Sequence, residues 1–454
     1  MKGIFNIFII ASLFIATSGT VWSQNSEMTL TVYNDDLALI KDVRIMALEN
    51  GVRSVKFSDV AAQIDPTSVH IKSLTAPEKV SVLEQNYEFD LVDVDKLMQK
   101  YIDQEIKAYT KEKVYAGTLL SAGQSDIMLK EGSGNIRVIN RRTILDVEFP
   151  SLPEGLITRP TLVWLVQSQK SGDHRMELSY LTSGINWHAE YVAVSKQNDT
   201  RLEISGWVSI DNRSGASYED AKLKLVAGDI HRVKPPTPRI SAETAFLAKA
   251  TAAPQFEEKS FFEYHMYTLQ RRATVRNNQI KQISLIPSTQ CTAKKVYIYD
   301  GGRDNKNVRV NLEFINSKKD GLGLPLPKGK IRVYKEDDDD HSLEFIGEDA
   351  IDHTPRDEKI RVFVGNAFDI VGERKQQDYK KLGKEAREET WQIQLRNHKD
   401  EAVNVTVVEH VYGDWEIRRK THNIARQDAN TIEFEVPVAK DAEAVLEYVI
   451  LYRW

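Results

Sequence analysis

The chain has 454 residues, of which 41% are apolar and 28% are charged, a composition typical of globular rather than disordered proteins. Its formal net charge is −5 at pH 7, and the absence of a basic tract argues against nucleic acid as a partner. Cys291 is the one cysteine, which excludes an intramolecular disulfide, so we expect packing alone to hold the core. At ~100–200 residues for each domain, this length predicts several domains.

The N-terminus predicts an export signal, residues 1–23. Lys2 provides a positive start, residues 4–16 are almost entirely apolar, and a small-residue cleavage site precedes Gln24. The apolar stretch is shorter than the ~20 residues of a transmembrane helix, so we expect no membrane-spanning helix after cleavage. A retained anchor helix is the alternative. No cysteine near the cleavage site offers a point for lipid attachment, and we expect a soluble exported protein.

Residues 28–87 are predicted to form short strands of a β-domain that spans 24–87 plus 152–231. Apolar and polar residues alternate along them, and the turns fall at 34–36 and 49–51, as expected for strands with one face on a core. The same alternation returns further along the chain. Because the two β-patterned stretches flank a segment of different texture, we predict one N-terminal β-domain that is discontinuous in sequence.

Residues 88–151 predict a small inserted unit. Asp93 is placed to cap a short helix in which Leu97 and Tyr101 share one face. Five short strands are expected to follow, with Gly117 at one of the bends. A helix followed by five short strands is similar to a small closed barrel of the SH3 or Sm type, an analogy that carries no function.

The stretch 178–229 has the clearest pattern in the chain, a meander of half-buried strands. Leu178 and Tyr180 alternate with polar residues, which places them on one face of a strand. A second strand has its apolar positions at Leu202, Ile204, Val208 and Ile210.

Residues 232–262 predict a linker, since 235–238 read Pro-Pro-Thr-Pro and 242–253 are rich in alanine. The second half, 263–454, is again β-patterned, with the strand spacing and turn chemistry of a β-sandwich. The predicted fold class is therefore mostly β. It comprises a discontinuous N-terminal β-domain with an inserted small SH3-like barrel, followed by a C-terminal β-sandwich.

The common catalytic motifs, HExxH, GxSxG, the Walker A loop, paired CxxC and the EF-hand loop, do not occur in the sequence. His188 and Glu190 are weak candidates for a metal site, because residues i and i+2 of a strand point to the same side. Two ligands are too few for a firm site. A solvated strand face is the more ordinary interpretation.

Glu409 is a weak candidate for a catalytic residue, because it occupies a position on an apolar stripe of alternate valines over 403–411. A carboxylate there must be paired, protonated or near the open end of the strand. Arg418 or Arg419, across a turn, could pair with it. A structural ion pair is favoured over a general base, since structural networks also perturb carboxylates.

The acidic run 337–340 could gather calcium, with Asp337 and Asp339 among the oxygen ligands. Four consecutive acids lack the alternating spacing of a calcium loop, which favours a solvated hairpin tip. Aromatic side chains could also line a sugar or peptide groove, although aromatic residues of β-sandwiches belong more often to the core. The weak ligand-binding candidates of this kind are Trp187, Tyr191, Trp207 and Trp415.

Several short pieces of the chain resemble a known family. They include Tyr-Leu-Thr-Ser-Gly-Ile-Asn-Trp at 180–187, Asn-Arg-Ser-Gly at 212–215, Leu-Val-Ala-Gly at 225–228, Gly-Asp-Trp at 413–415 and Tyr-Arg-Trp at 452–454. Together they resemble the bacterial family of domain of unknown function 4139, uncharacterised exported proteins similar to mucoidy inhibitor A. The resemblance implies a bacterial envelope protein. It implies no activity and no cofactor.

Export, stacked β-domains and the lack of a catalytic motif favour a non-enzymatic binding or scaffolding module of the cell envelope, periplasmic or secreted. Its partner would be an envelope protein, bound by strand addition at an edge strand. The alternative is an envelope hydrolase in which Glu409 is the perturbed carboxylate and His188 and Glu190 are metal ligands. A third hypothesis is calcium-stabilised adhesion through 337–340. The sequence leaves the oligomeric state open.

Overall fold

The computed structural model describes residues 27–151, 153, 156–196, 199–228, 255–337 and 339–454. The predicted export signal and most of the predicted linker lie outside the described residues. Nearly all regular structure is strand, which confirms the predicted mostly-β class. Within the described ranges α1 (Val94–Lys100) is the only α-helix. No helix in this part of the chain is long and apolar enough to cross a membrane.

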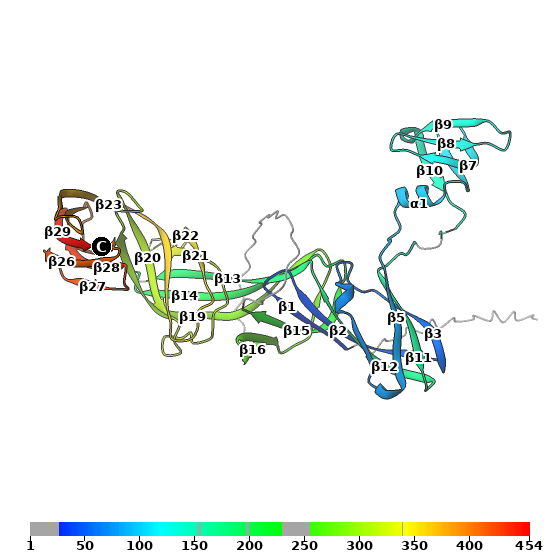
Figure 1. Cartoon of the computed structure of the whole chain (residues 1–454), viewed down its shortest axis with the longest axis horizontal. Coiled ribbons are helices and arrows are strands. Elements are labelled where there is room, and N and C mark those ends of the chain that lie inside the picture. Colours follow the sequence, from blue (N-terminus) through cyan, green and yellow to red (C-terminus); the bar gives the residue numbers. More distant parts are fainter. Residues whose placement is uncertain (1–26, 152, 154–155, 197–198, 229–254, 338) are drawn as a thin grey trace, which may run out of the picture.

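The β-structure forms an elongated body (Figure 1). Long strands run along its middle, the last strands of the chain lie at one end, and the small unit formed by 88–151 stands off near the other end.

The sheets at the N-terminal end combine strands from before and after the small unit. One has the order β16-β17-β15-β1-β2-β12-β4, with β18 pairing β15, and the other has the order β3-β11-β5. Their strands are β1 (Glu27–Tyr33), β2 (Ala38–Leu48), β3 (Gly51–Ser58), β4 (His70–Ser73), β5 (Val80–Glu88), β11 (Thr161–Ser168), β12 (Gly172–Thr182), β15 (Tyr218–Ala227), β16 (Phe256–Phe261), β17 (Tyr264–Leu269) and β18 (Ala273–Val275). The short 3-10 turns η1 (Pro66–Ser68) and η2 (Pro77–Lys79) lie between them.

The largest sheet has the order β22-β21-β13-β14-β19-β20-β23-β24-β29-β26, and β25 joins it through β19 and carries β28 and β27. Its strands are β13 (Ile185–Lys196), β14 (Arg201–Asn212), β19 (Gln279–Tyr299), β20 (Asn307–Ile315), β21 (Gly329–Glu336), β22 (Leu343–Ile351), β23 (Lys359–Lys381), β24 (Ala386–Asn397), β25 (Val403–His410), β26 (Asp414–Lys420), β27 (Ile424–Arg426), β28 (Thr431–Val438) and β29 (Ala442–Arg453).

This sheet crosses the predicted division between the two halves. β14 pairs antiparallel with β19 over its whole length, and β13 pairs in parallel with β21. The predicted β-sandwich over 263–454 is therefore not a separate unit, and the end of the predicted linker is the strand β16. Alternation predicts that a segment is a strand, but it does not choose the partner strand.

The strand patterns themselves are confirmed. Leu178 and Tyr180 are buried in β12, and the four apolar positions predicted for β14 are all buried. β13 buries every second residue from Ile185 to Ser195. The apolar side chains among them belong to one large core shared by the N-terminal sheets and the middle of the largest sheet. A second core fills the C-terminal end, where β25 and β28 pack against β24 and β29.

The small unit has its own core, which includes Met98, Tyr101 and Leu119. Asp93 caps α1 as predicted, because its Oδ1 accepts the backbone N–H of Lys96 at 3.0 Å. The sheet has the order β10-β6-β7-β8-β9. Its strands are β6 (Glu105–Thr110), β7 (Val114–Ala122), β8 (Asp126–Lys130), β9 (Ile136–Asn140) and β10 (Ile144–Glu148), with the 3-10 turn η3 (Arg141–Thr143) between the last two.

The predicted closed barrel is wrong, because this sheet is open. β9 and β10 are its two edges and do not pair with each other in the described chain. Closure depends on strand tilt and stagger, which the alternation of side chains does not determine.

Candidate functional site

Glu409 is buried in the C-terminal core with only 2% of its surface exposed. The Arg374 guanidinium from β23 binds it in a bidentate manner, with Nε 2.9 Å from Oε1 and Nη2 2.8 Å from Oε2. The hydroxyl of Tyr448 donates to Oε2 at 2.6 Å. The expected pairing with Arg418 or Arg419 is wrong, because those residues pair with Glu416 and Glu447.

Further contacts surround the pair formed by Glu409 and Arg374. Arg374 also stacks on the Trp391 ring, with its guanidinium carbon 3.4 Å from the ring centroid. Burial and the nearby Glu409 charge raise the pKa of the Tyr448 hydroxyl well above its ordinary value. Burial, followed by the Glu409 charge, raises the pKa of Tyr299 to about 12. Since both carboxylate oxygens accept hydrogen bonds from Arg374 and Tyr448, Glu409 belongs to a buried structural ion pair.

Next to this pair, aromatic side chains gather at the open end of the C-terminal core. The Tyr412 and Tyr452 rings are stacked with centroids 4.6 Å apart. The guanidinium of Arg387 contacts both of these rings and also the Trp454 ring. We call Tyr412, Tyr452 and Trp454 the aromatic end. Arg387 is held by Glu389, whose Oε1 lies 2.8 Å from its Nε.

Sequence reasoning missed the aromatic end as a group. A signal was present in the two family-like pieces 413–415 and 452–454. Asp414 and Trp415 on β26 lie opposite Arg453 and Tyr452 on β29. Trp415 pairs directly with Tyr452 across these strands and is half-buried. Of the four predicted ligand-binding aromatics, Trp415 is the one beside this place.

The other three predicted aromatics lie elsewhere. Trp187 and Tyr191 are buried in the large core, where they donate hydrogen bonds to the backbone carbonyls of Val226 and Pro327. Trp207 is half-buried on β14. Trp187 and Tyr191 are therefore core residues whose polar atoms are hydrogen-bonded. Aromatic residues of β-structures belong more often to the core than to a binding groove.

His188 and Glu190 share one face of β13 as predicted, with Nε2 and Oε1 3.5 Å apart. Gln282 also donates to Glu190 at 3.0 Å, and Arg332 lies 3.8 Å away. The hydrogen bond from His188 holds the pKa of Glu190 below its ordinary value, burial opposes this, and the Arg332 charge adds to the lowering. In the described ranges no three His, Cys, Asp or Glu residues are grouped so that they could hold a metal ion.

The structure does not bring Glu409 together with His188 and Glu190. Glu190 lies opposite Trp207 of β14, and Trp207 lies opposite Ser284 of β19. The strand that carries Glu409, β25, instead pairs with β19 near Tyr299. At ~3.3 Å for each residue, the intervening strand is about 50 Å long. These three residues therefore cannot act on one substrate molecule.

Asp337 and Asp339 lie in the turn between β21 and β22, part of which falls outside the described residues. The Asp337 carboxylate accepts the backbone N–H of Asp339 at 2.8 Å, and Asp340 accepts that of Ser342 at 2.8 Å. Such local bonds are typical of acidic residues in hairpin turns.

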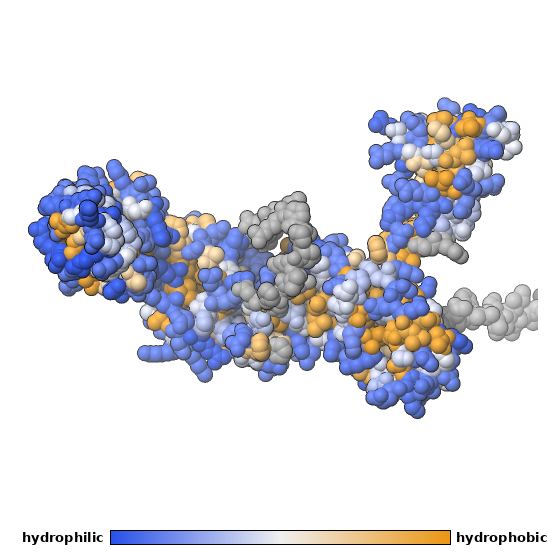
Figure 2. Space-filling model, viewed as in Figure 1, coloured by the Kyte–Doolittle hydropathy of each residue, from blue (hydrophilic) through white to orange (hydrophobic). Residues whose placement is uncertain are grey.

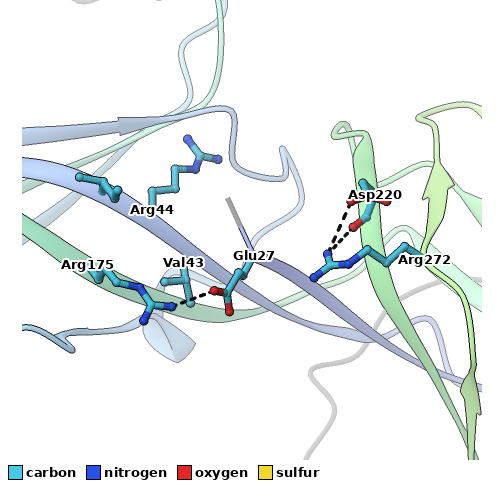
Figure 3. Close-up of a pocket in the computed structure, with 7 residues that line it drawn as sticks. Glu27, Val43, Arg44, Arg175, Asp220 and Arg272 are labelled. Carbon is cyan, nitrogen blue, oxygen red and sulfur yellow. Dashed lines mark hydrogen bonds and ion pairs between the residues drawn. The ribbon is translucent and has the colours of Figure 1, made fainter. Parts of the chain in front are cut away.

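A polar cleft of about 420 Å³ lies between β2, β12 and β15 (Figure 3). Its arginines are paired with acids: Arg175 with Glu27 at 2.9 Å, and Arg272 with Asp220 at 3.8 Å. Arg44 also lines the cleft, and it pairs with Asp42, a buried residue that is not part of the lining. Because the charges cancel in pairs, the cleft has no marked preference for a charged ligand.

The small unit presents a different kind of surface at its edge strand β9. Ile136 and Val138 are 65% and 58% exposed, and Met128, directly opposite Val138 on β8, is 41% exposed. Figure 2 shows apolar side chains on the face of this unit turned toward the viewer. We call Met128, Ile136 and Val138 the apolar edge.

The backbone of β9 also faces outwards at these positions. The bonds Glu131 N–H to Asn135 O and Arg141 N–H to Ser125 O fix which pairs of the β8–β9 hairpin are hydrogen-bonded. Because bonded and non-bonded pairs alternate in an antiparallel ladder, the backbone N–H and C=O groups of Ile136 and Val138 point away from β8. An extended segment could pair with them.

The fold defines a mostly-β protein of several sheets, in which the candidates Glu409 and Glu190 are engaged in ion pairs. The family described as domain of unknown function DUF4139 matches residues 176–454. The match covers more than half of the chain, so the chain belongs to the DUF4139 family. Residues 1–175, which include the small unit, lie outside the matched residues. A search of curated proteins finds no match.

Proposed function

We propose that this protein is exported to the bacterial cell envelope and acts there as a non-enzymatic binding module. The observation that carries the proposal is the unprotected edge strand β9, whose backbone groups and apolar side chains are presented together. Natural edge strands are usually protected by lysine, proline or a bulge. β9 has no lysine, proline or bulge, and its one charged residue, Arg137, is paired with Glu131. The opposite edge, β10, has an irregularity between Ile144 and Asp146.

The partner that fits β9 is an extended peptide segment with apolar residues at alternate positions. Backbone pairing would provide the affinity, and the apolar edge would contact every second side chain of the segment. β9 has only five residues, so it buries far less than the ~800 Å² that each partner contributes to a stable interface. A short segment of an envelope protein therefore fits better than a second folded copy of this chain.

The hydrolase alternative finds less support. It requires a carboxylate free to exchange a proton or hold a metal, and Glu409 is instead bound by Arg374 and Tyr448. Glu190 is likewise held by Gln282 and His188.

A photo-reactive amino acid at position 138 tests strand addition in intact cells. We expect a discrete adduct with one envelope protein, and we expect Ile136→Pro to abolish it, because proline removes the outward N–H while leaving the β8 ladder intact. Ile136→Thr keeps the N–H and is the matched control. An adduct that persists in the Ile136→Pro variant, or no adduct at all, would contradict the proposal.

Export is tested separately by mass spectrometry of the protein recovered from periplasm and medium. We expect a mature chain that begins at Gln24. Recovery of the full-length chain from the cytosol alone would rule export out.

A further inference from the structure

Two large rings of the aromatic end are open to solvent although they belong to an ordered cluster. Tyr412 is 55% exposed and Trp454 is 63% exposed, whereas Tyr452, on which Tyr412 stacks, is 5% exposed. Burying an aromatic ring is among the larger favourable contributions to folding and binding. Exposed rings that stand beside a stacked pair and a guanidinium are therefore suited to stack on a ligand.

The charges at this place select the class of ligand. The guanidinium carbon of Arg387 lies 5.0 to 5.7 Å from the three ring centroids, so a cation already contacts this cluster and a second one would be repelled. Its charge is balanced by Glu389, which is 7% exposed and also accepts the Trp391 indole N–H at 3.0 Å. An anion would meet this carboxylate directly behind the guanidinium. A net-neutral site favours a neutral ligand.

Polar groups at the rim complete the site. Arg387 Nη2 donates to the Tyr412 hydroxyl, whereas Arg387 Nη1 and the Trp454 indole N–H have no partner in the described part of the chain. The Tyr412 hydroxyl retains its own proton as a donor. Flat rings with hydrogen-bonding groups at their edge match a sugar, which has an apolar C–H face and hydroxyl groups around it.

We propose that the aromatic end binds a neutral carbohydrate through stacking on Tyr412 and Trp454, with Arg387 donating to sugar hydroxyls. The site is distinct from the apolar edge of the small unit. An envelope binding module with both surfaces would hold a glycan at one end and a protein segment at the other.

The test uses the mature chain on a printed array of neutral and anionic oligosaccharides, followed by titration calorimetry with the strongest glycan. We expect a neutral glycan to bind. We expect Tyr412→Ala and Trp454→Ala each to weaken binding roughly fivefold, the loss that corresponds to one aromatic contact. Phe368 on β23 is also a strongly exposed ring, at 95%, but does not belong to the aromatic end, so Phe368→Ala is the matched control and should bind as the parent does.

Thermal unfolding of each variant separates loss of binding from loss of fold. Ile136→Pro should leave glycan binding unchanged, so this inference and strand addition fail independently. The inference is overturned if no glycan binds, if the bound glycans are anionic, or if Tyr412→Ala and Phe368→Ala lower the affinity equally. Binding of a proline-rich peptide in place of every glycan, with the same dependence on Tyr412, would also overturn it.

Discussion

At the scale of single residues, the most informative position is Glu409. An ionised carboxylate in an apolar core is very costly unless it is paired and hydrogen-bonded. Here Arg374 and Tyr448 satisfy both of its oxygens. The sequence predicted that this carboxylate needs a partner, but the partner comes from β23, a strand that pairs with neither β25 nor the turn after it.

We predict that Glu409→Gln lowers the free energy of unfolding by about 3 kcal/mol, because it leaves the Arg374 charge half-buried without its counter-ion. Urea unfolding followed by circular dichroism measures the change. Glu447→Gln removes an exposed pair with Arg419 and should cost less than about 1 kcal/mol. Equal losses in the two variants would show that the buried pair has no special role.

A second residue-scale prediction concerns alkaline pH. Burial raises the pKa of Tyr218, Tyr299, Tyr452 and Cys291 to about 12. The native state keeps protons that the unfolded chain releases above its ordinary pKa values, 9.0 for cysteine and 10.0 for tyrosine. The stability from these groups is therefore fully present below about pH 9 and is lost as the pH rises toward 12, by about 1.4 kcal/mol for each group and pKa unit.

Urea unfolding between pH 7 and pH 11 measures this loss. Ultraviolet titration of tyrosinate in native and urea-unfolded protein provides the control, since the native curve should lie at higher pH. A free energy of unfolding that stays level up to pH 11 would contradict the prediction.

At the scale of elements, the close approach of β13 and β21 depends on a glycine. A Cβ built on Gly329 would lie 2.1 Å from the backbone oxygen of Ala189, its partner in the parallel register. Only a residue without a side chain fits there.

We predict that Gly329→Ala destabilises the protein by about 2–3 kcal/mol, because backbone atoms cannot move aside as a flexible side chain would. Gly365→Ala is the matched control, since nothing lies within 4 Å of the added Cβ on β23, and we expect a change within about 1 kcal/mol. Thermal unfolding of both variants checks the difference. A harmless Gly329→Ala would mean that β21 can separate from β13.

Elements also show where sequence reasoning stops. Period-two alternation correctly predicted β12 and β14, because one face of each strand must be buried whatever its neighbour is. It failed for the small unit, where the number of strands was right but closure was wrong. Whether β9 meets β10 depends on tilt and stagger over the whole sheet, and the η3 turn between them leaves both as edges.

At the scale of the whole molecule, the buried side chains form separate cores. The core of the small unit shares no buried residue with the other two. The larger cores meet along β19, whose first part belongs to one and whose last residues belong to the other. We therefore expect the two larger cores to unfold together, and the small unit to unfold separately from them.

We predict that residues 88–151 fold when expressed alone, because their core is complete without the body. Calorimetry of the isolated unit should show one cooperative transition, and the full chain should show a matching transition beside that of the body. Met98→Ala removes a buried side chain from this core. In the full chain it should lower the transition temperature of the small unit by several degrees and leave that of the body unchanged. An isolated unit without a cooperative transition would contradict the prediction.

The sequence by itself determined the mostly-β class, the faces of β12 and β14, the cap of α1 at Asp93 and the need of Glu409 for a partner. Each of these follows from short-range rules, the period of a strand, the unsatisfied N–H groups of a helix and the cost of a buried charge. Only the tertiary structure decided that β14 pairs with β19, that Arg374 neutralises Glu409 and that Tyr412 meets Tyr452 and Arg387. These are choices among partners distant in sequence, and they depend on how entire sheets pack rather than on any local pattern.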